Sequence, residues 1–145
     1  MDYQALYRMY RPQSFDDVVG QTHVTKTLRN AISKGKQSHA YIFSGPRGTG
    51  KTSIAKVFAK AINCLNSDDG EPCNECAICK GITQGTNNDV IEIDAASNNG
   101  VDEIRNIRDK VKYAPIKTKA KKVNLLGVIY MDMHFWRRDN CSIIV

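Results

Sequence analysis

The sequence predicts an α/β fold in which a parallel β-sheet is flanked by helices. Short apolar runs typical of buried strands alternate along the chain with segments whose apolar residues recur at helical spacing. A glycine-rich loop joins one of these strands directly to one of these helices. With 145 residues, of which 41% are hydrophobic, the chain has the length of one domain with one core.

Two helical segments precede the first expected strand. Residues Asp2 to Met9 are expected to form a short helix, and Tyr10 to Phe15 to be extended, because Pro12 disfavours helix in the residue before it. Gln21 to Ser33 is expected to be helical and to end before Gly35. The apolar residues on one face of that helix are Val24, Leu28, Ala31 and Ile32.

The next strand and helix enclose a phosphate-binding pattern. The apolar run from Ala40 to Phe43 predicts the strand, and Ser53 to Ile62 carries apolar residues at helical spacing. Between them the pattern G-x-x-x-x-G-K-[ST] is matched by Gly45, Pro46, Arg47, Gly48, Thr49, Gly50, Lys51 and Thr52. In such a loop the backbone N–H groups and the helix N-terminus bind phosphates, Lys51 reaches the γ-phosphate, and the Thr52 hydroxyl ligates Mg²⁺.

This loop predicts binding of a nucleoside triphosphate with Mg²⁺ through the residues of the pattern and the Ser53 that follows them. The alternative is a glycine-rich turn with a chance lysine, which the flanking strand and helix disfavour. A phosphate-binding loop at the carboxyl end of a strand in a parallel sheet is the arrangement of the P-loop NTPases.

Four cysteines follow the helix after this loop, with the spacing C-x8-C-x2-C-x2-C: Cys64, Cys73, Cys76 and Cys79. In a reducing cytosol this spacing indicates a metal site rather than disulfides, and four thiolates suit a structural, tetrahedral Zn²⁺ site. Zinc would order a loop that has few apolar residues. An iron–sulfur cluster is an alternative, although its C-x3-C-P element is absent, and free structural cysteines are another. Cys141 is expected to be a bystander.

The remaining elements continue the alternation. The last cysteines are expected at the start of a helix that runs to about Thr83, followed by a strand from Val90 to Ile93 and a turn at Asn98 to Gly100. A helix is expected from Val101 to about Tyr113, and a last strand within Val123 to Met131. The basic residues of that helix face either a nucleic acid or solvent; they are Arg105, Arg108, Lys110 and Lys112.

Composition limits the classes of function. The formal net charge of +6 fits an anionic partner, although a solvated basic surface explains it as well. The sequence has no run of 18 apolar residues, and its first residues lack the pattern of a signal peptide. We therefore expect a soluble, cytoplasmic protein that does not contact a membrane.

Beyond these patterns, three stretches of the chain resemble one family. They are Tyr7 to Gln21, which reads YRMYRPQSFDDVVGQ, the phosphate-binding loop with its four-cysteine insert, and Asp94 to Arg105, which reads DAASNNGVDEIR. Together they make about residues 1–115 similar to the bacterial clamp-loader ATPases, the tau/gamma subunits of DNA polymerase III. The insert makes this resemblance specific, because ordinary relatives in the AAA+ class share the loop and lack the cysteines.

The resemblance implies an AAA+ fold, with the N-terminal part of the ATPase domain in residues 1–115 and the zinc insert in residues 64–79. It also implies that the segment from Arg8 to Val19 contacts adenine. The residues carried over for this contact are Arg8, Arg11, Pro12, Val18 and Val19. An arm that only packs on the core is the alternative for any one of them.

After Pro115 the sequence departs from the family pattern, and residues 116–145 are expected to form an atypical tail with one further strand. The family continues into a strand that ends in Asp-Glu, where the Asp helps to hold Mg²⁺ and the Glu polarises the attacking water. Asp132 aligns with that Asp and is, with Lys51, a candidate catalytic residue, whereas Met133 stands in the place of the Glu. The abrupt change indicates an aberrant or truncated C-terminus.

In function, the resemblance implies an ATP-binding motor subunit that acts in DNA replication with other clamp-loader subunits, a sliding clamp and primed DNA. This chain is expected to bind ATP without efficient hydrolysis, and its oligomerisation is doubtful without the family's C-terminal collar. Two alternatives are a nucleotide- and zinc-binding interaction module that does not hydrolyse ATP, and another AAA+ DNA motor. The second alternative leaves the cysteine insert unexplained.

Overall fold

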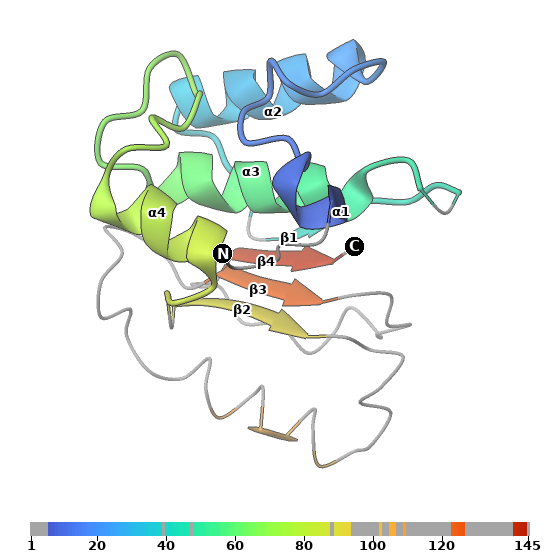
Figure 1. Cartoon of the computed structure of the whole chain (residues 1–145), viewed down its shortest axis with the longest axis vertical. Helices are drawn as coiled ribbons and strands as arrows, with labels where there is room; N and C mark the ends of the chain where they lie inside the picture. The colour runs from blue at the N-terminus through green and yellow to red at the C-terminus, as the bar shows by residue number, and fades with distance from the viewer. Residues whose placement is uncertain are drawn as a thin grey trace.

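The computed structural model describes residues 6–38, 40–46, 48–87, 89–93, 102, 105, 106, 109, 123–126 and 141–144. In chain order its elements are α1 (Leu6–Met9), α2 (Thr22–Ser33), β1 (Ala40–Ile42), α3 (Lys51–Asn63), α4 (Ala77–Gln84), β2 (Val90–Ile93), β3 (Val123–Leu126) and β4 (Cys141–Ile144) (Figure 1). None of the described helices is long and apolar enough to cross a membrane.

The four strands form a single parallel sheet in the order β1-β4-β3-β2. The strands β1, β2 and β3 lie at positions where apolar runs predict strands. The strand β4, which lies between β1 and β3, was not predicted. It pairs Ser142 with Ala40 of β1 and Cys141 with Val123 of β3. The sheet therefore brings the end of the chain beside the strand that precedes the glycine-rich loop.

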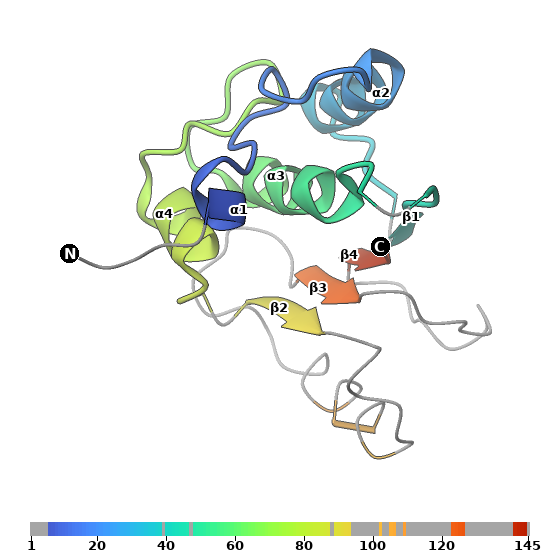
Figure 2. The same cartoon turned by 45° about the vertical axis from the view of Figure 1, so that its right-hand side comes forward.

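The described helices α1 to α4 all lie on one face of this sheet (Figures 1 and 2). The helix α3 lies directly over the strands, and α2 lies beyond it, on the side away from the sheet. Of the helix predicted over residues 101–113, only positions 102, 105, 106 and 109 are among the described residues. The rest of that predicted helix lies outside the part of the chain that the structure describes.

The core is centred on α3, which is buried around most of its circumference, as expected for a helix between two layers. The ring of Phe58 meets the ring of Tyr41 edge to face, with centroids 4.6 Å apart. Phe15, from the segment between α1 and α2, is 2% exposed in the same cluster. The core residues are Phe15, Leu28, Ile54, Ala55, Val57, Phe58, Ala59 and Ala61.

A tight turn presses the cysteine-containing loop against α2. In this turn Asp69 and Gly70 have φ values of 44° and 78°, and the N–H of Glu71 donates to the carbonyl of Asp68 at 2.7 Å. A Cβ atom on Gly70 would lie 2.7 Å from the carbonyl oxygen of Arg29 in α2. Only glycine therefore fits both the left-handed backbone and the close approach to α2.

We predict that Gly70→Ala destabilises the protein more than Gly35→Ala. Both glycines have positive φ, so alanine costs roughly 1–2 kcal/mol at either position. A Cβ at Gly35 meets nothing within 4 Å, whereas at Gly70 it meets backbone. Denaturant unfolding of the two variants tests this, and equal free energies of unfolding would contradict the packing of the turn on α2.

Candidate nucleotide site and metal centre

The glycine-rich loop connects β1 to the first turn of α3. Gly48 and Gly50 have φ values of 84° and 83°, which residues with a Cβ rarely adopt. Gly50 is also the N-cap of α3, and no side chain caps this helix. The N–H groups of the first turn of α3 therefore point out of the helix, where an anion can accept from them.

The ammonium group of Lys51 lies over the loop. Its Nζ donates to the carbonyl oxygens of Gly45 at 3.0 Å and of Pro46 at 2.7 Å. The hydroxyl of Thr49 donates to the same Pro46 carbonyl at 2.9 Å. This arrangement holds the positive charge of Lys51 beside the backbone of the loop, where a phosphate group could accept from it.

A cavity of about 420 Å³ brings the loop together with a distant segment of the chain. Its walls combine the start of α3 with the segment of residues 10–17, which we call the arm. The lining residues are Tyr10, Arg11, Pro12, Gly48, Gly50, Lys51, Thr52 and Ser53. The volume lies in the usual range for small-ligand sites, and both charged lining residues are cations. Tyr10 lies within the segment predicted to contact adenine, between Arg8 and Arg11, but it was not among the residues named for that contact.

A second cavity, of about 450 Å³, lies on the other side of the loop, between α2 and β1. Gly45, Pro46, Thr49 and Lys51 line it, so the predicted loop residues are divided between two concave surfaces. Apolar side chains from α2 and β1, including Val24 and Leu28, make up much of its wall. The first cavity has the more polar wall of the two.

Some residues predicted to bind the nucleotide do not line either cavity. Val18 packs against the core and Val19 is 93% exposed, and neither lines either cavity. Arg8 belongs to α1, but its side chain is outside the described part of the structure, as are Arg47 and Asp132.

The four cysteines of the insert converge on one point. Cys64 directly follows α3, Cys76 is the N-cap of α4, and Cys79 lies in the first turn of α4. The four Sγ atoms all lie within 4.8 Å of one another. In a tetrahedral Zn²⁺ site they would be about 3.8 Å apart, so a small contraction is enough to bind the ion. The cluster is consistent with a zinc site.

Backbone N–H groups already surround the sulfur atoms. Cys73 donates to the Sγ of Cys64 at 3.3 Å, Cys76 to Cys73 at 3.3 Å, and Cys79 to Cys76 at 3.4 Å. Burial opposes ionisation of Cys76, but N–H groups of Leu65 and Cys79 lower its pKa to about 6. Burial raises the pKa of Cys64 and of Cys79. A dication would reverse this rise, because a coordinating thiol is deprotonated outright.

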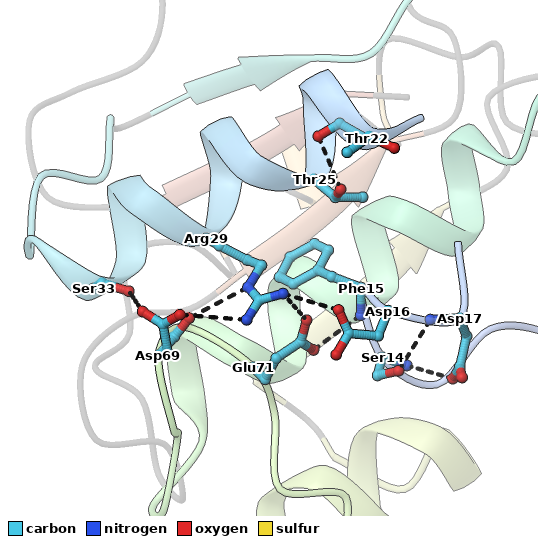
Figure 3. Close-up of polar contacts among 10 residues, drawn as sticks. All are labelled: Ser14, Phe15, Asp16, Asp17, Thr22, Thr25, Arg29, Ser33, Asp69 and Glu71. Atoms are coloured by element: carbon cyan, nitrogen blue, oxygen red, sulfur yellow. Dashed lines mark hydrogen bonds and ion pairs between the residues drawn. The ribbon is translucent and has the colours of Figure 1, made fainter. Parts of the chain in front are cut away.

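The arm is shaped by a local hydrogen-bonded turn (Figure 3). The carboxylate of Asp17 accepts from the N–H groups of Gln13 at 3.0 Å and of Ser14 at 2.9 Å. The N–H of Asp17 in turn donates to the Ser14 hydroxyl at 3.2 Å. The N–H of Gln13, followed by the Ser14 hydroxyl, holds the pKa of Asp17 below its ordinary value of 3.8. The ionised carboxylate therefore stabilises the arm.

Comparison with known proteins gives a family. Residues 20–131 match the family model described as DNA polymerase III, delta subunit. The chain is 67% identical over 131 residues to DNA polymerase III subunit tau of Bacillus subtilis, covering 90% of this chain and 23% of that protein. It is 49% identical over 131 residues to subunit tau of Escherichia coli, covering 90% of this chain and 20% of that protein. It is 47% identical over 131 residues to subunit gamma of Buchnera aphidicola, covering 90% of this chain and 36% of that protein.

The chain therefore belongs to the DNA polymerase III subunit family that this model describes. Within it, the likeness is to the tau and gamma subunits, as the sequence motifs predict. The match reaches residue 131 and thus extends past Pro115, where those motifs end. The chain spans only about a fifth to a third of the length of these relatives.

We predict that the purified protein contains about one zinc ion per chain, bound by Cys64, Cys73, Cys76 and Cys79. Cys76→Ser should lower the metal content and loosen the insert, because serine replaces a thiolate with a weak ligand. Elemental analysis of reduced protein measures this. Cys141→Ser, outside the cluster, is the matched control and should retain its zinc. Iron, or an absence of metal, in the wild type would overturn the zinc assignment.

We predict that Asp17→Asn costs stability at neutral pH and that this cost shrinks in acid. The folded-state pKa of Asp17 is lowered, so its ionised form stabilises the fold above pH 3.8 and this contribution is lost as the pH falls through the lower value. The measurement is the difference in unfolding free energy between wild type and variant as a function of pH. A difference that grows on acidification would contradict the argument.

Proposed function

We propose that this chain is an ATP-binding AAA+ module of the sliding-clamp loader of the DNA polymerase III holoenzyme, acting in bacterial DNA replication in the cytoplasm. The observation that carries the proposal is the cavity in which the glycine-rich loop and the arm meet. A phosphate-binding loop alone accepts many phosphorylated ligands. The arm forms a second wall, which includes Arg11 and Pro12, two of the residues predicted to contact adenine. This wall gives the site room for a nucleoside.

The fold supports this proposal. The loop follows the carboxyl end of β1 in a parallel sheet, where ligands bind in open α/β sheets. The helix α3 begins at Lys51, so its N-terminal N–H groups and its partial positive charge face the cavity that receives the phosphates. The family and the P-loop pattern agree with an AAA+ fold.

In the proposed site each residue has a separate task. Lys51 exchanges the carbonyls of Gly45 and Pro46 for the γ-phosphate, which is a stronger acceptor because it is charged. The Thr52 hydroxyl would ligate Mg²⁺, which neutralises phosphate charge when bound. The arm contributes Tyr10, Arg11 and Pro12 on the side where the ribose and base extend from the phosphates.

We further propose that this chain binds ATP without efficient hydrolysis. Binding requires the loop, Mg²⁺ and the arm, whereas turnover also requires an oriented water and compensation of charge in the transition state. In the sequence, Met133 follows Asp132 at the place where the family pattern has a glutamate that polarises the water. The same feature favours a second candidate function, a nucleotide- and zinc-binding interaction module.

The partners proposed are other clamp-loader subunits, the sliding clamp and primed DNA. The relatives are DNA polymerase III subunits, which supports a place in that complex. Of the basic residues proposed to face DNA, Arg105 is exposed and forms an ion pair with Asp102 at 3.4 Å. Such an exposed pair is worth little, so phosphate can compete for the guanidinium.

We predict that Lys51→Ala weakens ATP binding by about tenfold or more, because a charge-assisted hydrogen bond contributes roughly 1.5–3 kcal/mol. Isothermal calorimetry with Mg²⁺ measures the affinity. Lys56→Ala, further along α3 and paired with Glu92 at 2.7 Å, is the matched control and should bind like the wild type. Equal affinities for wild type and Lys51→Ala would overturn the assignment of the loop.

The same preparations test whether the chain binds ATP without hydrolysing it. We expect no ATP turnover above background even with clamp and primed DNA present. Turnover also needs an arginine supplied in trans by a neighbouring subunit, which is typically worth about 10³ to 10⁵ in rate. Robust turnover that Lys51→Ala abolishes would instead establish a working motor and refute binding without hydrolysis.

A further inference from the structure

A buried lysine joins the cysteine loop to the arm. Lys60, on α3, is 2% exposed, and its ammonium group donates three hydrogen bonds of 2.8 Å. Two go to the carbonyl oxygen and the side-chain Oε1 of Gln13, and the third goes to Oδ1 of Asn74. Asn74 lies between the metal-ligand candidates Cys73 and Cys76. One charged group thus ties the arm to the loop that carries the cysteines.

The arm continues this connection to the cavity wall. The Nε2 of Gln13 donates to the carbonyl oxygen of Arg11 at 3.0 Å, and Arg11 lines the proposed nucleotide cavity. Thr83 of α4 also donates to Gln13 Oε1, at 3.3 Å. The side chain of Gln13 is therefore held at its oxygen by Lys60 and Thr83 and holds Arg11 through its nitrogen.

A second contact joins the same two segments (Figure 3). Glu71, two residues before Cys73, accepts from the N–H of Phe15 at 2.9 Å through Oε2. Its Oε1 lies 3.3 Å from Arg29 of α2, which also pairs with Asp16 of the arm at 2.9 Å. The loop therefore contacts the arm directly at Phe15 and is connected to it at Gln13 through Lys60, so a shift of the loop would disturb the arm at two points.

The chemistry of Lys60 makes this link sensitive to the loop. A buried ammonium needs all its donors satisfied, and every acceptor of Lys60 belongs to the arm or to the loop. If the loop shifts, Asn74 moves with it, and the buried ammonium group loses one of its three acceptors.

We infer that Lys60 is a positioning residue that couples occupancy of the cysteine site to the arm wall of the nucleotide cavity. This inference rests on the proposed function and deepens it, since it makes the metal a determinant of nucleotide affinity. The coupling acts on the ribose and base side of the site through Lys60, Gln13 and Arg11. The phosphate side is independent of it, because none of the contacts of Lys60 involves the glycine-rich loop.

The test compares Lys60→Met with Lys56→Met, the same substitution one turn earlier on α3. Each protein is titrated by calorimetry with ATP and with inorganic tripolyphosphate, in the same Mg²⁺ buffer. Lys60→Met should weaken ATP binding by at least about fivefold, the lower end of typical coupling between sites, and leave tripolyphosphate affinity unchanged. Lys56→Met should change neither.

Metal removal provides the second half of the test. Wild type dialysed against a zinc chelator and returned to Mg²⁺ buffer should show the same selective loss of ATP affinity, and chelation of Lys60→Met should add little to its loss. Such non-additivity is the signature of two changes acting through one connection. Should Lys60→Met fail to fold, Gln13→Glu replaces it, because it retains an acceptor for Lys60 and removes the donor to Arg11.

Each outcome is decisive. Equal loss of ATP and tripolyphosphate affinity in Lys60→Met, or no loss at all, would overturn the coupling and leave ATP binding standing. Fully additive effects of chelation and substitution would also overturn it. A wild type that binds neither ligand would instead refute the proposed function, and the coupling with it.

Discussion

The burial of α3 against the sheet is the constraint on which both candidate sites depend. The N-cap of this helix is Gly50 of the glycine-rich loop, and its C-cap is Cys64, the first of the four cysteines. A helix of 13 residues sets these ends about 20 Å apart. Because Val57, Phe58 and their neighbours fix the helix in the core, neither end can move without disturbing the packing of the whole domain.

Both candidate sites could be predicted from the sequence because their residues are close together along the chain. The loop from Gly45 to Thr52 and the cysteine cluster each lie within one short segment, so spacing alone indicates their chemistry. The contacts that join them could not be read. Lys60 is 47 residues from Gln13, and Glu71 is 56 residues from Phe15. A lysine in a helix normally reads as solvent-exposed, and only the tertiary structure supplies the acceptors that allow its burial. The strand β4 was missed for the same reason, since four residues become a strand only between β1 and β3.

The charge beside the cysteines explains why a lysine suits this position. Four thiolates with Zn²⁺ carry a net charge of about −2, which is costly to bury without compensation. The ammonium of Lys60 donates to Asn74, which lies between Cys73 and Cys76. Beside such a centre Lys60 would do two things: it would offset the negative charge and it would hold the arm. Methionine could fill the space, but it could do neither.

The arm is anchored to the core by Phe15 and is otherwise held by polar contacts, and this division has a functional consequence. Tyr10, at the start of the arm, is 78% exposed, so apolar burial does little to fix that end. Its course instead depends on the Lys60–Gln13 contacts and on the Glu71–Phe15 hydrogen bond. Hydrogen bonds to a loop can be exchanged without repacking a core, whereas the phosphate-binding loop is continuous with the buried helix α3. The candidate nucleotide cavity therefore has one wall set by the core and one wall held by contacts to the cysteine loop, and in the coupling that we propose only the second wall responds to what that loop binds.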